Sequence, residues 1–344
     1  MAFRELVDRS EVAYMAKPTG WFQIGWSHEY EIGTVKPIKY FGRDLVAYRT
    51  EDDVLRVVDA HCPHFGAHLG FGGKVEDNCI RCPFHGWKWG PDGHNDEIPY
   101  STKKNTTKQL VGHSVEERNG IAYMWHSPIG EDPVGEPPFI PELTDDESHH
   151  SPYPEACKLW DNSLLFPQFI LENNVDYAHV KYLHEWDTIP VAEPIEVTDD
   201  SFRTVFSGEL ETKQGRTSMR LVTVAHGVGI LVSRMYGIRG AVSVIGTTPI
   251  DDLRSDVRVT VAVERFDKDG DTVPPVVHGI RKAQLITTFE QDFPVWANMK
   301  YNVTPPFPRE EAHDFIKMRK WAKRFYPQLT STVESTGELR TANR

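Results

Sequence analysis

Hydrophobic residues in the first third of the chain alternate with polar ones or form short runs, and Gly or Asp residues separate these stretches. Such a pattern predicts short β-strands joined by turns. The predicted strands are 21–26, 36–42, 45–50, 54–60 and two within 110–126 on either side of an Asn119-Gly120 turn. We therefore expect an all-β unit at the start of the chain.

The pattern changes after residue 130. Prolines and acidic residues crowd the stretch 127–154, which is typical of a linker, so we place a domain boundary near 130–150. Beyond it, the sequence predicts a helix around 163–185, a strand-rich stretch over 200–265, and helices at 276–301 and 309–326. Strands followed by helices are typical of an α+β domain with a mostly antiparallel sheet.

We thus predict two domains. The first covers 18–130 and the second covers 131–344, and the segment 1–17 could pack on the second. With 344 residues, the chain is long enough to bury a core without disulfides or structural metals.

Composition and charge narrow the functional classes. The chain is 39% hydrophobic and 26% charged, which is typical of a globular protein. Its formal net charge of −12 argues against binding to nucleic acid or to an anionic membrane through basic residues. We find no signal peptide and no apolar run that could span a membrane, and we expect a cytoplasmic protein.

Cysteines are few, and in a reducing cytosol they are more often metal ligands or catalytic groups than disulfides. Three of the four lie within residues 62–82. Of these, Cys79 stands near the end of a predicted strand, and we expect it to be a packing residue. We expect the same of Cys157.

The first chemical pattern consists of two Cys–His pairs, Cys62-Pro-His64 and Cys82-Pro-Phe-His85. A structural zinc site is one interpretation, because two thiolates and two imidazoles can hold a tetrahedral metal. However, each predicted loop mixes one Cys with one His. Both Cys could then bind one iron and both His another, which is the ligand set of a Rieske [2Fe–2S] centre. We favour the Rieske interpretation.

The second pattern lies in the predicted helix 163–185. Asn173, Asp176 and His179 recur every three residues and would form one ridge of that helix. His184 follows His179 by five residues, about 140° around an ideal helix, so a shared metal requires the helix to bend or end near residue 183. The alternative is an amphipathic helix with solvent-facing histidines.

A mononuclear iron site with two histidines also needs a carboxylate and an open face. The predicted helix 276–301 carries an apolar stripe, and Asp292 falls on it. A carboxylate there is costly without a partner, and a metal would supply one. The stripe comprises Leu285, Phe289 and Trp296. Glu290 and Glu264 are the rival carboxylates.

With these residues in place, nearly the whole chain resembles the terminal oxygenase (alpha) components of Rieske non-heme iron oxygenases. Within that family it is most similar to the 3-ketosteroid 9α-hydroxylase oxygenases. The supporting segments are RCPFHGWKW (81–89), DEIPY (96–100), ERNGIAYMW (117–125), FEQDFPVWANMKY (289–301) and RKWAKRFYPQ (319–328).

The resemblance implies an N-terminal Rieske [2Fe–2S] domain and a C-terminal helix-grip (START-like) catalytic domain with an antiparallel sheet. It implies one cluster and one mononuclear non-heme Fe(II) per subunit. The cluster ligands would be Cys62, His64, Cys82 and His85, and the iron ligands His179, His184 and Asp292. It also implies a ring-shaped homotrimer, in which Asp176, supported by Asn173, links a cluster histidine of one subunit to His179 of the next.

The implied activity is that of a monooxygenase rather than a dioxygenase. It uses O2 and electrons that a ferredoxin-type or flavin reductase delivers from NAD(P)H, and it hydroxylates a bulky apolar, steroid-like substrate. The alternatives are an aromatic-ring hydroxylase or O/N-demethylase that acts on an aromatic acid and, from another class, a Rieske electron-transfer protein. A zinc-stabilised binding protein is a further alternative. Expected pocket residues are Phe166, Phe169, Val175, Met219, Val224, Ile230, Met235, Ile286 and Trp296.

Overall fold

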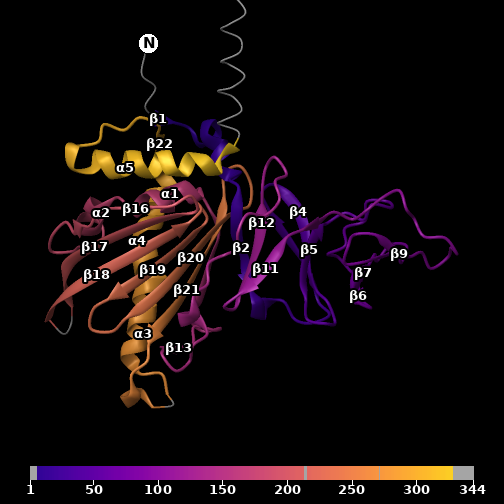
Figure 1. Ribbon diagram of the computed structural model, residues 1–344, viewed down its shortest axis with the longest axis horizontal. Coiled ribbons are helices and arrows are strands. Elements are labelled where there is room, and N and C mark those ends of the chain that lie inside the picture. Colours follow the sequence, from indigo (N-terminus) through magenta and orange to yellow (C-terminus); the bar gives the residue numbers. More distant parts are fainter. Residues whose placement is uncertain (1–5, 213–214, 271, 328–344) are drawn as a thin grey trace, which may run out of the picture.

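The computed structural model describes residues 6–212, 215–270 and 272–327. A β-rich unit occupies one end of the molecule, and a large sheet with helices on it forms the other (Figure 1). This is the predicted α+β class, with the β-rich unit first in the chain.

The β-rich unit contains three small antiparallel sheets, with strand orders β10-β5-β4-β3, β11-β12-β2 and β6-β7-β8-β9. Its strands are β2 (Gly20–Trp26), β3 (Val35–Tyr40), β4 (Arg43–Arg49), β5 (Leu55–Asp59), β6 (Lys74–Glu76), β7 (Cys79–Arg81), β8 (Lys88–Trp89), β9 (Asn95–Glu97), β10 (Gly112–His113), β11 (Val115–Arg118) and β12 (Ile121–His126). The predicted turn joins β11 to β12, and both of its residues have positive φ (51° at Asn119 and 78° at Gly120), as a tight hairpin requires.

The larger unit is built on a nine-stranded antiparallel sheet. Its main path runs β13-β21-β20-β19-β18-β17-β15, while β14 pairs with β21 and β16 with β17. The strands are β13 (His149–His150), β14 (Cys157–Ser163), β15 (Val191–Ala192), β16 (Glu196–Val197), β17 (Ser201–Thr212), β18 (Gly215–His226), β19 (Ile230–Tyr236), β20 (Ala241–Pro249) and β21 (Ser255–Glu264).

Strand β21 joins the two units because both of its faces are covered. Its odd-numbered residues from Val257 to Val263 belong to the core under the helices. Its even-numbered residues face the β-rich unit, where the Trp26 indole N–H donates to the Thr260 hydroxyl at 2.7 Å. Because side chains alternate along a strand, β21 packs against the helices with one face and against the β-rich unit with the other.

The predicted helix 163–185 is wrong as a single element. The structure has two short helices there, α1 (Pro167–Asn173) and α2 (Tyr177–Tyr182). The break falls at Asp176, whose backbone is not helical (φ −91°, ψ 81°) and whose carboxylate accepts the His179 N–H. Aspartate side chains favour this capping geometry over the interior of a helix, which explains the break.

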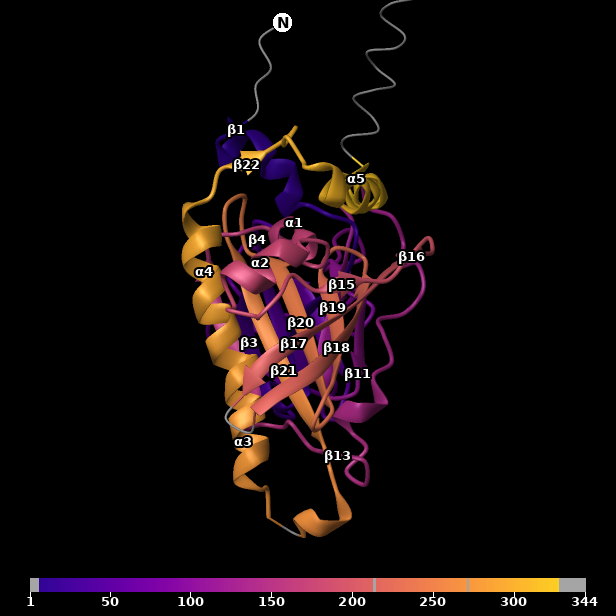
Figure 2. The same cartoon turned by 90° about the vertical axis from the view of Figure 1, so that its left-hand side faces the viewer.

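The other predicted helices are confirmed. Residues 276–301 contain α3 (Pro275–Lys282), a π-helical turn η5 (Ala283–Thr287) and α4 (Thr288–Asn298), which runs along one face of the sheet (Figure 2). Residues 309–326 contain α5 (Arg309–Ala322) and the 3-10 turn η6 (Lys323–Phe325). The predicted apolar stripe is buried against the core.

The N-terminal segment lies against the larger unit. Strand β1 (Leu6–Val7) pairs with β22 (Tyr301–Asn302), and the 3-10 helix η1 (Arg9–Ala16) places Tyr14 edge-on to Tyr326 at 5.7 Å. The remaining 3-10 turns are η2 (Ser27–Glu29), η3 (Pro141–Leu143) and η4 (Asp267–Asp269). Across the described ranges, no helix is both long and apolar enough to cross a membrane.

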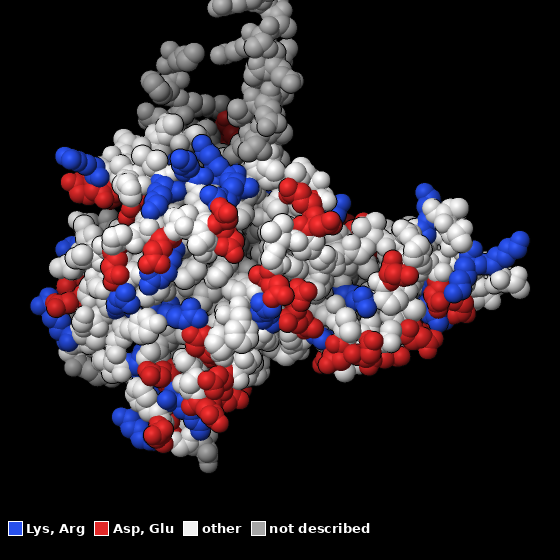
Figure 3. Space-filling view, viewed as in Figure 1, with Lys and Arg blue, Asp and Glu red and all other residues white. Residues whose placement is uncertain are grey.

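Charged side chains of both signs are interspersed over the face shown in Figure 3.

Candidate metal centres

The two predicted Cys–His pairs lie on two loops of matching geometry, which follow β5 and β7. In each loop the Cys N–H donates to the carbonyl five residues later, at 2.9 Å for Cys62 and 2.8 Å for Cys82. The carbonyls of these cysteines accept the N–H of Gly66 and Gly86. Both glycines have positive φ (79° and 71°), a conformation that Gly adopts without steric cost.

The loops bring the four predicted ligands together at one end of the β-rich unit. The rings of His64 and His85 lie 4.9 Å apart, and Cys62 and Cys82 are buried with free thiols. The Nδ1 atoms of both histidines are buried and have no hydrogen-bond partner in the described part of the chain. Buried nitrogens of this kind call for a bound partner, so the residues present fit a cluster with two thiolate and two imidazole ligands.

Two tryptophans support the loops. The indole N–H of Trp89 donates to the Cys62 sulfur at 3.3 Å, and the Trp87 ring stacks on His64 at 4.0 Å. Burial raises the pKa of the Cys62 thiol, so the thiolate form depends on a bound cation. Sequence reasoning missed the role of Trp89, because its sulfur partner lies 27 positions away in the loop that follows β5.

Cys79 and Cys157 lie outside this group, as predicted. Cys79 is buried in β7, and Cys157 lies in β14, where its sulfur lies 3.8 Å from the Pro152 carbonyl oxygen.

The second group consists of His179, His184 and Asp292. One ligand atom from each lies within 4.8 Å of the others, and the His184 Nε2 to Asp292 Oδ1 distance is 3.4 Å. Asp292 is only 4% exposed, whereas the rival Glu290 is exposed and Glu264 accepts the Gly240 N–H. Two imidazoles and one carboxylate on one side of a site are the donor set of non-heme Fe(II) oxygenases, so the residues present fit a mononuclear iron.

The helix boundaries bring these side chains together. Helix α2 ends at Tyr182, close to the end that a shared metal requires, and Glu185 has a positive φ of 58°. His184 therefore lies outside the helix, and its side chain can face the same point as that of His179. Asp292 reaches that point from α4.

Hydrogen bonds hold both imidazoles in one orientation. The Nδ1–H of His184 donates to Gln291 Oε1 at 2.9 Å, and the Nδ1–H of His179 donates to the Asp176 carbonyl. The Nε2 atoms of both rings therefore face the polar groups of the site, where His184 Nε2 lies 3.4 Å from Asp292 Oδ1 and His179 Nε2 lies 3.4 Å from the Asn173 amide nitrogen. Burial alone would lower the pKa of His184, but its bonds to Asp292 and Gln291 outweigh burial and raise it. Gln291 was missed from the sequence, and only its place beside Asp292 hinted at it.

Asn173 and Asp176 lie beside His179, but not on the predicted helical ridge. The Asn173 amide nitrogen is 3.4 Å from His179 Nε2, and Asp176 caps α2 through a 3.2 Å bond from the His179 N–H. Burial raises the pKa of the Asp176 carboxyl, but its hydrogen bonds from His179 lower it more strongly. Within one chain, Asp176 therefore acts as an ionised helix cap.

Most of the expected pocket residues lie in or against the core beneath the helices, among them Phe166, Phe169 and Trp296. The expectation that Ile230 lines the pocket is wrong. This residue belongs to the cluster of Trp21 and Trp26 on the opposite face of the sheet, because strand alternation turns it away from α4.

Comparisons with known proteins agree with this architecture. Residues 20–111 match the family described as the Rieske [2Fe-2S] domain, and residues 124–326 match the 3-ketosteroid 9α-hydroxylase C-terminal domain. The chain is 30% identical to cholesterol 7-desaturase nvd from Xenopus laevis, over 92% of this chain and 74% of that protein. It is 27% identical to a 3-ketosteroid-9-alpha-monooxygenase oxygenase component from Rhodococcus rhodochrous, over 96% of this chain and 87% of that protein.

Among solved structures, dicamba monooxygenase bound to dicamba has the same fold, with a TM-score of 0.71 at 14% identity over 91% of this chain and 98% of that one. A caffeine-bound NdmA from Pseudomonas putida CBB5 gives 0.71 at 16% identity over 94% of both chains. The predicted fold class is confirmed. The chain belongs to the Rieske oxygenases with a 3-ketosteroid 9α-hydroxylase C-terminal domain, and it is a terminal oxygenase that uses a [2Fe–2S] cluster and a non-heme iron.

Proposed function

We propose that this oxygenase oxidises a ring carbon of a steroid or sterol. The observation that carries the proposal is the convergence of His179, His184 and Asp292 beneath the helices of a chain whose C-terminal region matches the 3-ketosteroid 9α-hydroxylase family. We assign these three residues as the iron ligands. The ligands that we assign to the cluster are Cys62, His64, Cys82 and His85.

The histidines and Asp292 of the site have different parts in preparing it for iron. His179 and His184 present fixed Nε2 atoms, because their Nδ1–H groups are already bonded. Asp292 supplies the anionic ligand from within an apolar core that includes Phe289 and Trp296 and excludes water. Activation of dioxygen with electrons from the cluster is the chemistry that the iron supplies when bound.

We also propose that the working unit is a homotrimer in which electrons pass from one subunit to the next. Within one chain the cluster loops lie in the β-rich unit at one end, while α2 and α4 lie on the larger unit (Figure 1). Phe65 (74% exposed) and Phe84 (60% exposed) flank the histidines of these loops, as expected of a surface covered by another copy. We assign Asp176 as the link to that copy, with Asn173 as its support.

Two finer assignments accompany the proposal. We keep the domain boundary between residues 130 and 131, with 1–17 on the catalytic domain. We place the protein in the cytoplasm, where NAD(P)H and a reductase are at hand and where Cys62 and Cys82 do not form a disulfide.

The decisive experiment is a turnover assay with a surrogate reductase, NADH and a panel of 3-ketosteroids, sterols, aromatic acids and methyl ethers. We expect substrate-dependent NADH consumption with the steroid compounds, and a product that is heavier by one oxygen atom. Turnover of aromatic acids or methyl ethers alone would overturn the proposed substrate class. Iron analysis should give three irons per subunit, two from the cluster and one mononuclear. Two irons would instead indicate an electron-transfer protein.

Desaturation is a second candidate reaction, because the relative from Xenopus laevis is a cholesterol 7-desaturase. Hydroxylation places one oxygen atom of O2 in the product and reduces the other to water with two electrons and two protons. Desaturation removes two hydrogen atoms from the substrate and reduces O2 to two waters with the same two electrons. A product lighter by two hydrogen atoms would identify the second reaction.

A further inference from the structure

Helix α5 contacts both ends of the turn that joins α1 to α2. On the α1 side, Arg319 of α5 forms a two-point ion pair with Glu172, with N–O distances of 3.0 and 2.8 Å. On the α2 side, the Tyr177 hydroxyl donates to Asp314 of α5 at 3.3 Å. The residues between these tethers are 173–176, which include both polar groups that we assign to electron transfer.

The negative charge of the Glu172 carboxylate lies where it needs compensation by hydrogen-bond donors. Its side chain is 13% exposed and stands in the last turn of α1, where the helix dipole disfavours a negative charge. In addition to Arg319, the Tyr301 hydroxyl and the Gln168 amide each donate to Glu172 Oε1 at 2.7 Å. Of these four donated bonds, one comes from within α1 and three come from α5 and β22, which together hold the end of α1 in one place.

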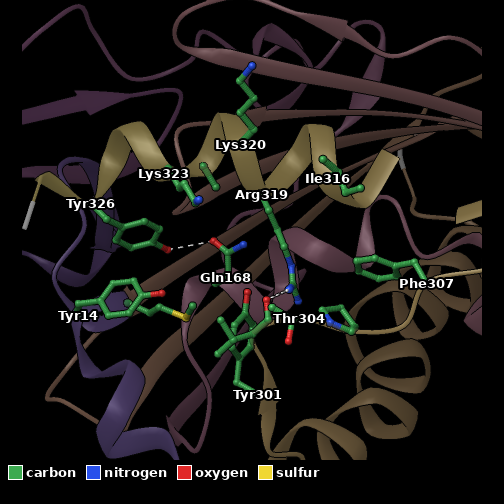
Figure 4. A pocket seen from close by; sticks show the side chains of 14 residues that line it. Tyr14, Gln168, Tyr301, Thr304, Phe307, Ile316, Arg319, Lys320, Lys323 and Tyr326 are labelled. Carbon is green, nitrogen blue, oxygen red and sulfur yellow. Dashed lines mark hydrogen bonds between the residues drawn. The ribbon is translucent and has the colours of Figure 1, made fainter. Parts of the chain in front are cut away.

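Arg319 is itself firmly held. Its guanidinium lies over the rings of Tyr301 (4.8 Å) and Phe307 (5.6 Å) and donates to the carbonyls of Asn302 and Val303. Figure 4 shows it extending from α5 towards Tyr301 and Thr304, at the wall of a cavity of about 660 Å³. This planar, multiply bonded geometry suits Arg and does not suit Lys.

The held turn reaches the iron site through short contacts. The Val175 N–H donates to the Glu172 carbonyl at 3.1 Å, and the Asp176 N–H donates to the Asn173 carbonyl at 3.3 Å. The Asp176 carbonyl then accepts the Nδ1–H of His179. A shift of Glu172 would therefore move the acceptor that orients the His179 ring.

We infer that the Arg319–Glu172 pair is a positioning device that sets the orientation of His179 and Asp176 from outside the site. This inference rests on the proposed role of His179 as an iron ligand. It assigns α5 a part in the reaction, although Arg319 and Asp314 are not among the residues assigned to the metal.

The test compares Arg319→Met with Arg319→Lys in the holoenzyme. We expect Arg319→Met to weaken binding of the mononuclear iron about tenfold, as loss of an outer hydrogen-bond partner does. Amide hydrogen exchange over 173–176 should accelerate, NADH consumption should become uncoupled from product, and the cluster spectrum should stay unchanged. Arg319→Lys should recover part of the iron affinity, because it keeps the charge.

The matched control is Arg324→Ala, which removes an exposed pair with Asp199 near the same end of α5. We expect wild-type iron affinity in this variant. If Arg319→Met lowers the melting temperature but leaves iron affinity and amide exchange at wild-type values, the pair is only structural and the inference is wrong.

Two further variants keep the test decisive. Should Arg319→Met fail to fold, Tyr177→Phe removes a single hydroxyl from the other tether, and we expect it to weaken iron binding about threefold. An unchanged iron affinity in Tyr177→Phe would then overturn the role of α5. His179→Ala separates the two proposals. If it keeps its mononuclear iron, the assigned ligand set is wrong; if it loses the iron while Arg319→Met keeps wild-type affinity, only the inference about α5 fails.

Discussion

The two metal centres are assembled in different ways. The cluster loops lie within residues 62–85, and each is closed by backbone hydrogen bonds of its own. The iron site joins α2 to α4, whose assigned ligands are more than 100 positions apart, and side chains such as Gln291 hold it. Local backbone bonds make the first site largely independent of the rest of the fold, whereas the second depends on where two helices pack. We expect the two sites to respond differently to mutation.

The largest effects are expected from two single variants, each of which removes one assigned ligand from one of the two sites. We expect His184→Ala to lose the mononuclear iron but keep the cluster, and Cys82→Ser to lose the cluster but keep that iron. Both should reduce turnover by about a thousandfold or more, since several kcal/mol of metal-dependent stabilisation is removed. Iron analysis and visible absorption check this. Loss of both metals in either variant would contradict the independence of the two sites.

The next effect separates the two roles of Asp176. Asp176→Asn keeps a good helix cap, so we expect a wild-type melting temperature. It removes the negative charge proposed to link the subunits, and we expect turnover to fall about a hundredfold with both metals present, in line with the 10- to 100-fold cost of changing an outer partner of a metal ligand. Single-turnover reoxidation of the reduced cluster measures the step directly. Wild-type rates would show that Asp176 is only a cap.

A smaller effect concerns Gln291. Gln291→Leu removes the acceptor of the His184 Nδ1–H, and we expect about tenfold weaker binding of the mononuclear iron. The neighbouring Glu290→Gln, which changes an exposed residue on the same helix, serves as the control and should bind iron normally. Equal iron affinities in the two variants would show that Gln291 does not support iron binding.

The last prediction concerns stability rather than activity, and it is a pH dependence in the β-rich unit. Burial lowers the pKa of His126 to about 4, and its ring stacks on Phe41 at 3.7 Å while Nδ1–H donates to the Pro18 carbonyl. The unfolded chain therefore binds the additional proton first, so stability is complete above pH 6.5 and falls as the pH drops from 6.5 towards 4.

We expect His126 to account for about 2–3 kcal/mol of that loss. Chemical denaturation of wild type and His126→Gln at pH 7.5 and pH 5 measures it as the difference between the two proteins. Equal losses of stability in both proteins would show that other groups cause the acid sensitivity.

Much of the architecture could be predicted from periodicity. The β-hairpin at Asn119-Gly120, the helices over 276–301 and 309–326, and the burial of Asp292 on an apolar stripe all depend on local patterns. The prediction was wrong where two local preferences compete. The spacing of Asn173, Asp176 and His179 suits a continuous helix, but Asp176 gains more as a cap and divides it.

The sequence by itself determined the cluster motif, the fold class and the three residues that meet near α4, because ligand spacing and hydrophobic period are properties of the chain. Only the tertiary structure decided that Trp89 reaches Cys62, that Gln291 orients His184 and that Arg319 holds Glu172. These contacts join residues distant in sequence or on different elements. Their geometry depends on how sheets and helices pack, and no short pattern in the chain encodes that packing.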